Sequence, residues 1–467
     1  MQYMPITEDI LQKIQSIVGA SAVFSDPESM KPYSHDEVTD PVYHHMPEAV
    51  ALPQTTEQVA ALVRLANEYR FPIVPRGAGT GLACGAVPSL GGLVISLEKM
   101  NRIIEINEKS LYAIAEAGVR TEELQQEAAK RGLFYAGDPC SGDSCFIGGN
   151  IATNAGGNRA VKYGTTRHQV YELEVVSPTG EILHLGARLH KMTTGYALEQ
   201  LIIGSEGTLG IVTRCTLRLL PKPQHVFDLL AVYPTLQQAV DTVEHLTLSG
   251  ITPACIELMD SVTIQSVENF LGESLPGTGN RHYLIIQLDG NNEDQLDEEA
   301  VAIDELCTET GAIEVLTADS TKIWRARKAF AEAVRAESLI VCKEDIVVPV
   351  DQEPAILQTI FDLAAEHDLI TRIAAHAGDG NIHLNIIKPQ QMSHEDWTSM
   401  LQVFQQKLYT AIYSLGGRLS GEHGIGEKRK KLLAQFTGEA ELNMMKAIKK
   451  SLDPNMILNP GKLFDIR

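Results

Sequence analysis

The chain has 467 residues, a formal net charge of −21 at pH 7 and an apolar content typical of globular proteins. Its length predicts at least two domains, and its composition argues against disorder, fibres and repeat arrays. The negative charge repels polyanions, so we expect no nucleic-acid partner. No stretch approaches the roughly 18 apolar residues of a transmembrane helix, and the first residues lack the basic region of a secretion signal, which predicts a cytoplasmic protein.

The N-terminal third predicts alternating helices and strands. Apolar residues with helical spacing occupy 10–18, and a second helix follows Thr55, which forms a capping-box pattern with Gln58. The apolar runs 72–75 and 92–97 are predicted strands on either side of a glycine-dense segment. This order predicts an α+β fold.

The residue pattern changes at 221–226, where the glycine-dense part of the sequence ends, and this change predicts a domain boundary between residues 222 and 223. Helices and strands alternate from there to about residue 410. Further helical patterns cover 397–413 and 438–450, and the tail at 458–463 predicts a turn that leads into a final strand. The seven cysteines form no C-x-x-C pair, so we expect most of them to be buried and none to hold a metal cluster.

Glycines are concentrated in three segments, at 77–85, 137–157 and 204–210. The first, Arg76-Gly-Ala-Gly-Thr-Gly81, is not followed by a helix pattern and therefore does not fit a Rossmann fingerprint. Its successive backbone N–H groups could instead form an anion-binding nest, although such a run alone is equally typical of a tight turn. The other two segments would let backbone approach a large planar ligand, and Ser144, Asn150 and Thr153 add neutral hydrogen-bonding groups.

Histidines and a carboxylate occur in two glycine-framed segments near the C-terminus. In His376-Ala-Gly-Asp-Gly-Asn-Ile-His383 the Gly378-Asp-Gly380 turn breaks the strand, which brings both rings together. Asn385 is expected on the same polar face as His383. The second segment supplies Glu422 and His423. Any one of these histidines alone would be typical of an ordinary core or surface residue, but two imidazoles and a carboxylate suit Zn²⁺ or Fe²⁺.

Four motifs together resemble a known family. They are Pro75-Arg-Gly-Ala-Gly-Thr80, Ile147-Gly-Gly-Asn-Ile-Ala-Thr-Asn-Ala-Gly156, Gly204-Ser-Glu-Gly-Thr-Leu-Gly210 and Asn459-Pro-Gly-Lys462. The chain resembles the FAD-linked oxidases of the vanillyl-alcohol-oxidase type, with a PCMH-type FAD-binding domain, in the branch of the glycolate oxidases and the D-lactate dehydrogenases. The resemblance implies an FAD-binding domain of two α+β subdomains over 1–222, an α+β cap that binds substrate over 223–410, and a segment at 411–467 that returns to the FAD-binding domain.

The resemblance also implies which residues contact FAD. They lie in or beside the glycine segments and in the C-terminal motif: Pro75, Arg76, Gly77, Ala78, Gly79, Thr80, Gly81, Gly137, Asp138, Pro139, Ser144, Gly148, Asn150, Thr153, Gly157, Gly207, Gly210, Ile211 and Asn459. Relatives that bind flavin covalently often have histidine near the end of the first glycine loop. This chain has Thr80 there, so we expect non-covalent FAD.

For the histidines and the glutamate near the C-terminus, the resemblance implies a divalent metal held by His376, His383 and Glu422, with His423 as the catalytic base. It implies that Arg327 and Lys343 bind the substrate carboxylate together with Asn385, although cations of this kind are usually solvated. Enzymes that act on 2-hydroxyglutarate would carry a hydroxyl one helical turn after Arg327, whereas this chain has Ala331 there. This difference favours a small substrate over the longer diacid.

These assignments predict an FAD-dependent dehydrogenase of a small 2-hydroxy acid, with D-lactate as the first expectation. Glycolate or another short D-2-hydroxy acid is the alternative, and a non-catalytic flavin-binding protein within a larger oxidoreductase is a further one. His423 would accept the proton of the substrate hydroxyl, and flavin N5 would accept the hydride from the α-carbon. The resemblance implies that the electrons pass to a separate electron-transferring flavoprotein.

Overall fold

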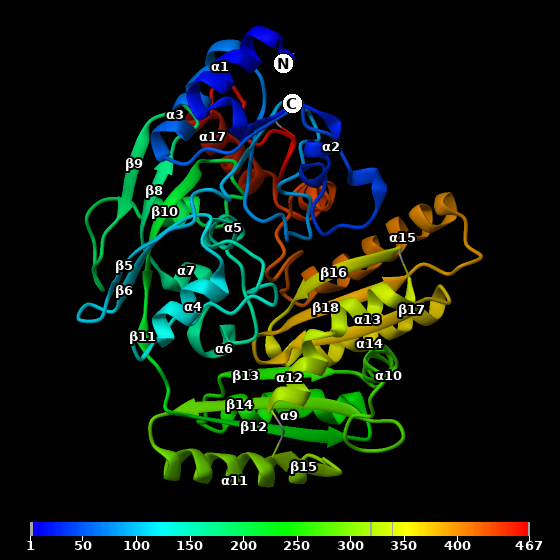
Figure 1. Cartoon of the computed structure of the whole chain (residues 1–467). Helices are drawn as coiled ribbons and strands as arrows, with labels where there is room; N and C mark the ends of the chain where they lie inside the picture. Colours follow the sequence, from blue (N-terminus) through cyan, green and yellow to red (C-terminus); the bar gives the residue numbers. More distant parts are fainter. Residues whose placement is uncertain (1–2, 318–319, 339, 466–467) are drawn as a thin grey trace. The chain divides into compact units, whose positions relative to one another are not determined.

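The computed structural model describes residues 3–317, 320–338 and 340–465. The chain divides into two compact units. Unit 1 comprises 1–156, 164–222 and 422–467, and unit 2 comprises 157–163 and 223–421. The predicted cap ended at residue 410, whereas unit 2 extends to Gly421. Both units combine helices and sheets, which confirms the α+β class (Figure 1).

The first sheet of unit 1 has the strand order β1-β2-β4-β3. Its elements are β1 (Val23–Phe24), β2 (Ala49–Ala51), β3 (Ile73–Arg76), β4 (Leu93–Ser96), α1 (Glu8–Val18), α2 (Pro27–Met30) and α3 (Thr56–Tyr69). Apolar residues of α1 and α3 at the predicted helical spacing form one core with β2, β3 and β4. Strands β3 and β4 are parallel, and the glycine-dense segment 77–92 joins them without a helix.

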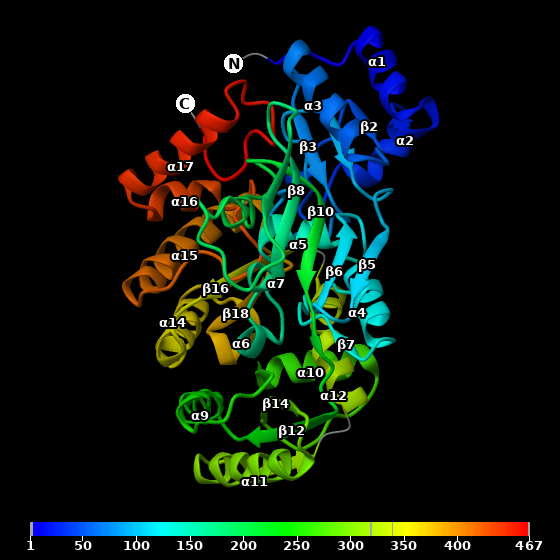
Figure 2. The ribbon, with the colours of Figure 1, turned by 90° about the vertical axis from the view of Figure 1, so that its left-hand side faces the viewer.

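The second sheet of unit 1 has the order β5-β6-β10-β8-β9 and is antiparallel throughout. Figure 2 labels β5, β6, β8 and β10 of this sheet. Its strands are β5 (Ile103–Asn107), β6 (Tyr112–Glu116), β8 (Val170–Val176), β9 (Ile182–Gly186) and β10 (Ile211–Arg218). The accompanying elements are α4 (Thr121–Ala129), β7 (Leu133–Phe134), α5 (Ile147–Thr153), α7 (Thr166–Gln169), α8 (Leu198–Ile202), β11 (Leu220–Pro221), α16 (Lys430–Phe436) and α17 (Glu439–Leu452). Helices α4 and α5 bury Leu124, Ile147 and Ile151 against this sheet.

Unit 2 is built on a sheet with the order β15-β12-β14-β13-β17-β18-β16. Its strands are β12 (His225–Tyr233), β13 (Cys255–Met259), β14 (His282–Gly290), β15 (Glu314–Thr317), β16 (Val341–Val347), β17 (Ile370–His376) and β18 (Asn381–Ile387). Its helices are α6 (Ala160–Tyr163), α9 (Leu236–Leu248), α10 (Ser261–Leu271), α11 (Glu293–Glu309), α12 (Ser320–Lys328), α13 (Phe330–Glu337), α14 (Glu353–Glu366) and α15 (His394–Ser414). Apolar residues of α10, α12 and α13 cover one sheet face.

The predicted final strand is wrong for the described residues. Beyond α17, Leu458 forms a single parallel bridge to Ile73. The extended run stops there because Asn459 has a positive φ of 43° and Pro460 has no N–H to donate. In the same described part of the chain, no helix combines the length and the apolarity needed to cross a membrane.

Candidate active site

Unit 1 brings the three glycine segments and the C-terminal motif together. A Cβ added to Gly77 would lie 3.5 Å from Cα of Gly149, and one added to Gly207 would lie 2.7 Å from Cγ of Pro75. The side-chain amide of Asn459 donates to the carbonyls of Gly85 (2.9 Å) and of Glu206 (2.8 Å). Segments 72 to 374 residues apart in the sequence therefore form one local structure, which a set of unrelated turns would not do.

The glycines of this region have different structural roles. A Cβ at Gly148 would lie 2.6 Å from Cβ of Ala117, and one at Gly210 would lie 2.5 Å from Cγ1 of Val175, so tight packing explains both. Around Gly149, by contrast, an added Cβ meets no heavy atom within 4 Å. Backbone at Gly149 is thus open to an approaching ligand.

The first glycine loop rests on buried charged groups. The Arg76 guanidinium donates to the carbonyl of Pro32 (3.0 Å) and lies directly beneath Gly79, whose φ is +79°. The Asp36 carboxylate accepts the backbone N–H of Cys84 (2.7 Å). Burial lowers the pKa of Arg76 and raises the pKa of Asp36. The side chain of Arg76 therefore supports the loop from within unit 1.

The other predicted FAD contacts of unit 1 are placed in and around α5. Asn150 is buried and donates its amide to the hydroxyl of Thr121 (2.8 Å). The Thr153 hydroxyl donates to the carbonyl of Gly149 (3.2 Å). Ser144 is exposed. Ala78, Thr80, Asp138 and Pro139 are half-buried, Gly81 is exposed, and Gly137 and Ile211 are buried. Gly157 falls in unit 2.

Glu206 holds the segment that carries Glu422 and His423. Its two carboxylate oxygens accept the N–H groups of Ile425 and Gly426, each at 2.7 Å. Burial raises the pKa of Glu206, and these two donors oppose that shift. In the same segment Oε2 of Glu422 would lie 2.7 Å from a Cβ at Gly156, so glycine lets the carboxylate keep this position.

Polar residues of unit 2 gather on one face of its sheet. Side chains on neighbouring strands that are directly paired point to the same face, and residues two apart on a strand share that face. Glu257 on β13 pairs with His376 on β17, and His376 pairs with Asn381 on β18. His383, two residues after Asn381, pairs with Asp345 on β16. The pairing thus puts both histidines and both carboxylates on the same side.

The two histidine rings lie side by side, as predicted. The 3₁₀ turn η5 (Ala377–Asp379) joins β17 to β18, and the ring centroids of His376 and His383 are 4.9 Å apart at an interplanar angle of 86°. The rings are largely buried, with 2% of His376 and 9% of His383 exposed. The Gly378-Asp-Gly380 turn therefore has the predicted effect.

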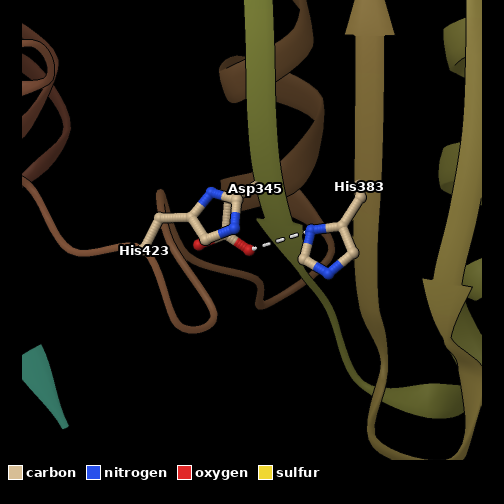
Figure 3. Close-up of side chains that lie close together, drawn as sticks. All are labelled: Asp345, His383 and His423. Atoms are coloured by element: carbon tan, nitrogen blue, oxygen red, sulfur yellow. Dashed lines mark ion pairs between the residues drawn. The ribbon is translucent and has the colours of Figure 1, made fainter. Parts of the chain in front are cut away.

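Each histidine has a buried carboxylate beside Nδ1. For His376 this is Glu257, whose Oε1 lies 2.6 Å from Nδ1. For His383 it is Asp345, at the longer distance of 3.8 Å. The Asp345 carboxylate also accepts hydrogen bonds from the Asn381 amide (2.8 Å) and the Ser420 hydroxyl (2.6 Å). Figure 3 shows the pair of Asp345 and His383, and it also draws His423, a residue of unit 1.

The predicted substrate ligands have different surroundings. Arg327 on α12 is buried, and its Nε and Nη2 lie 2.8 Å and 2.7 Å from Oε2 of Glu257. Lys343 on β16 pairs with Asn385 on β18, so both belong to the same sheet face as the histidines. Asn385 is buried and Lys343 is partly exposed. Ala331 is exposed on α13, which begins after an interruption of the helix at Ala329.

Sequence reasoning missed Glu257 and Asp345. Glu257 stands in the apolar strand Cys255-Ile-Glu-Leu-Met259, where a lone acid is a signal of a buried, partnered carboxylate. Asp345 follows Glu344, and only the strand register distinguishes the two: Glu344 accepts a hydrogen bond from the Tyr409 hydroxyl instead.

Known proteins match the chain along most of its length. The family of FAD linked oxidases, C-terminal domain, matches residues 222–463, and an FAD binding domain matches residues 47–186. A D-lactate dehydrogenase of Anaerostipes hadrus is 39% identical over 99% of this chain and 98% of the relative. Glycolate oxidase subunit GlcD of Bacillus subtilis is 35% identical over 98% of this chain and 97% of that protein. The solved structure of p-cresol methylhydroxylase with substrate bound is 18% identical, covers 100% of this chain and 99% of its own, and has a TM-score of 0.83, which establishes a shared fold.

Proposed function

Because the chain belongs to the FAD-linked oxidases and is an oxidoreductase with FAD as its cofactor, we propose that it oxidises D-lactate to pyruvate. The observation that carries this proposal is the sheet face of unit 2, where two imidazoles, two carboxylates and the cations Arg327 and Lys343 gather. A small hydroxy acid offers a carboxylate for the cations and a hydroxyl proton for a base.

The residues of unit 1 fit FAD. Open backbone at Gly149, beside Gly77, suits the close approach of a dinucleotide, and the relatives support the same assignment. When bound, the flavin supplies the two-electron acceptor that no protein side chain provides. We infer that the predicted glycine-segment residues and Asn459 surround it. Thr80 replaces the histidine to which some relatives link flavin, so the cofactor is held without a covalent bond.

His376, His383 and Glu422 form a donor set that fits Zn²⁺ or Fe²⁺. Glu422 belongs to unit 1, and we propose that it joins the two histidines because it follows directly on the last residue of unit 2. Ser420, two residues earlier, is hydrogen-bonded to Asp345, and two residues of extended backbone reach at most about 7 Å. A bound divalent ion would act as a Lewis acid that lowers the pKa of the substrate hydroxyl.

The remaining roles belong to side chains. His423 follows Glu422 directly, so a metal-bound substrate would lie within its reach, and a neutral imidazole nitrogen can take the hydroxyl proton near neutral pH. Arg327 and Lys343 hold the carboxylate, and Asn385 donates a hydrogen bond on the same face. Holding the carboxylate at two points orients the Cα–H bond.

A second candidate is the oxidation of glycolate, which the similarity to glycolate oxidase subunit GlcD favours. Resemblance also supports the passage of electrons to a separate electron-transferring flavoprotein. Reduction of such a heterodimer by the substrate-reduced enzyme, faster than reduction of oxygen or a quinone, is the expected result. Efficient turnover with oxygen alone would contradict this partner.

The test is anaerobic bleaching of the purified flavoprotein by D-lactate, L-lactate, glycolate and 2-hydroxyglutarate. D-Lactate should reduce the flavin fastest, and His423→Ala should slow that reduction about 10²- to 10⁴-fold while FAD stays bound. Faster reduction by glycolate would favour the second candidate. Unimpaired reduction in the variant would remove His423 from its role, and no reduction by any of the four acids would overturn the proposed function.

A further inference from the structure

Glu257 is a fully buried carboxylate that contacts two functional side chains at once. Its exposed fraction is 0%, and it lies on β13, a central strand of the unit 2 sheet. Oε1 is 2.6 Å from Nδ1 of His376, and Oε2 is 2.8 Å from Nε and 2.7 Å from Nη2 of Arg327. The predicted metal ligand and the predicted carboxylate ligand are therefore joined through one side chain.

Such a carboxylate is costly to bury. Transfer of an ion into the protein interior carries a penalty of several kcal/mol, which a partner charge offsets only in good geometry. Cys255 and Met259, which share the face of Glu257 on β13, are apolar and buried, so a hydrophobic side chain would suit this position. Replacing a buried ion pair with apolar residues is often neutral or stabilising, so packing alone does not account for Glu257.

Arg327 donates to Oε2 of Glu257, and with the carboxylate as acceptor on both sides the proton of the contact with His376 is assigned to Nδ1. A neutral imidazole with its proton on Nδ1 presents the lone pair of Nε2. Carboxylates in this position orient a metal-binding histidine and increase its basicity. The contact of Asp345 with His383, at 3.8 Å, is longer than a hydrogen bond, so Glu257 makes the tighter of the two contacts.

We propose that Glu257 is a positioning residue for both the metal ligand His376 and the substrate ligand Arg327, an inference that rests on the proposed function. It fixes His376 with Nε2 directed to a divalent metal, and it fixes the guanidinium of Arg327 in one orientation toward the substrate carboxylate. Loss of Glu257 should therefore weaken metal binding and raise KM for the hydroxy acid together, although Glu257 touches neither of them.

The test is Glu257→Gln in the FAD-loaded protein, with Zn²⁺ or Fe²⁺ affinity measured by competition against a chelator. Loss of a carboxylate behind a metal-binding histidine typically weakens affinity about 10- to 100-fold, and we expect that range here, with a raised KM for D-lactate. Glu344→Gln is the matched control, because Glu344 is also a buried acid of the same sheet but bonds Tyr409 and Gln405. The control should retain the wild-type metal affinity.

Glu257→Asp provides a second variant should the glutamine protein not fold. It keeps the negative charge but moves both carboxylate oxygens back by one methylene, which breaks the hydrogen bond to His376 and leaves a longer charge attraction to Arg327. Metal affinity should therefore fall, while the rise in KM should be smaller than in Glu257→Gln. Wild-type metal affinity in both variants, with metal bound stoichiometrically by the parent, would overturn the role of Glu257 and leave the proposed function intact. A parent protein that binds no divalent metal would instead overturn the metal site, and this inference with it.

Discussion

Replacing Glu206 with glutamine should loosen the segment that carries Glu422 and His423. Glutamine has one acceptor oxygen, so only one of the two N–H groups of Ile425 and Gly426 keeps its partner, and the other faces an N–H donor. A hydrogen bond to a charged group contributes about 1.5–3 kcal/mol. At 1.36 kcal/mol for each factor of ten, local opening should become about 10- to 150-fold more frequent.

Amide hydrogen exchange measures this opening directly. A peptide that contains Ile425 and Gly426 should exchange faster in Glu206→Gln by that factor, while peptides from the core of unit 2 should not change. Glu441→Gln, a change at an exposed acid of α17, serves as the control for lost charge. Unaltered exchange at both amides in Glu206→Gln would show that the carboxylate does not hold the segment.

Three further outcomes are expected. Burial raises the pKa of Asp260, the N-cap of α10, from 3.8 to about 6, so its contribution to stability is present below pH 3.8 and lost as pH rises through about 6. The unfolding free energy of Asp260→Asn relative to wild type should rise by about 3 kcal/mol over that interval. Hydrogen bonds to Ser29 lower the pKa of Asp26, so its contribution is present above pH 3.8 and lost as pH falls below it, and the unfolding free energy of Asp26→Asn relative to wild type should fall as pH rises to 3.8 and stay level above it. Acid precipitation should release the flavin, whereas flavin that stays with the polypeptide would refute non-covalent binding at Thr80. Chelation should abolish D-lactate oxidation with FAD retained, and full activity in metal-free protein would remove the metal from the reaction.

Local patterns predicted many of the elements. The helical spacing at 10–18 and the strands at 72–75 and 92–97 correspond to α1, β3 and β4. Thr55 caps α3 by accepting the N–H of Gln58 (3.3 Å), as the capping pattern indicated. The reciprocal half of the box differs, because the Gln58 side chain accepts the N–H of Gln54. These features depend on residues close in sequence.

The sequence patterns could not predict which strands pair when they are far apart in the chain. The turn at Gly378–Gly380 predicted that His376 and His383 would meet, since both belong to one hairpin. Glu257 reaches His376 only because β13 and β17 pair across more than one hundred residues, and no local periodicity specifies that register. The glycine segments suggested a shared ligand, but their dependence on Asn459 likewise became visible only in three dimensions.

Unit 1 is drawn from three stretches of chain, of which the last, 422–467, leaves the ribosome after all the rest. That stretch provides Asn459 and the buried Lys449, whose ammonium donates to the carbonyls of Thr208 and Leu458. A nascent chain that lacks them cannot complete the glycine-rich region, whereas residues 223–421 have by then been synthesised and can begin to fold. Flavin loading in the cell should accordingly wait until residues 422–467 have been synthesised, and a chain truncated before Lys449 should have an ordered unit 2 and no bound chromophore.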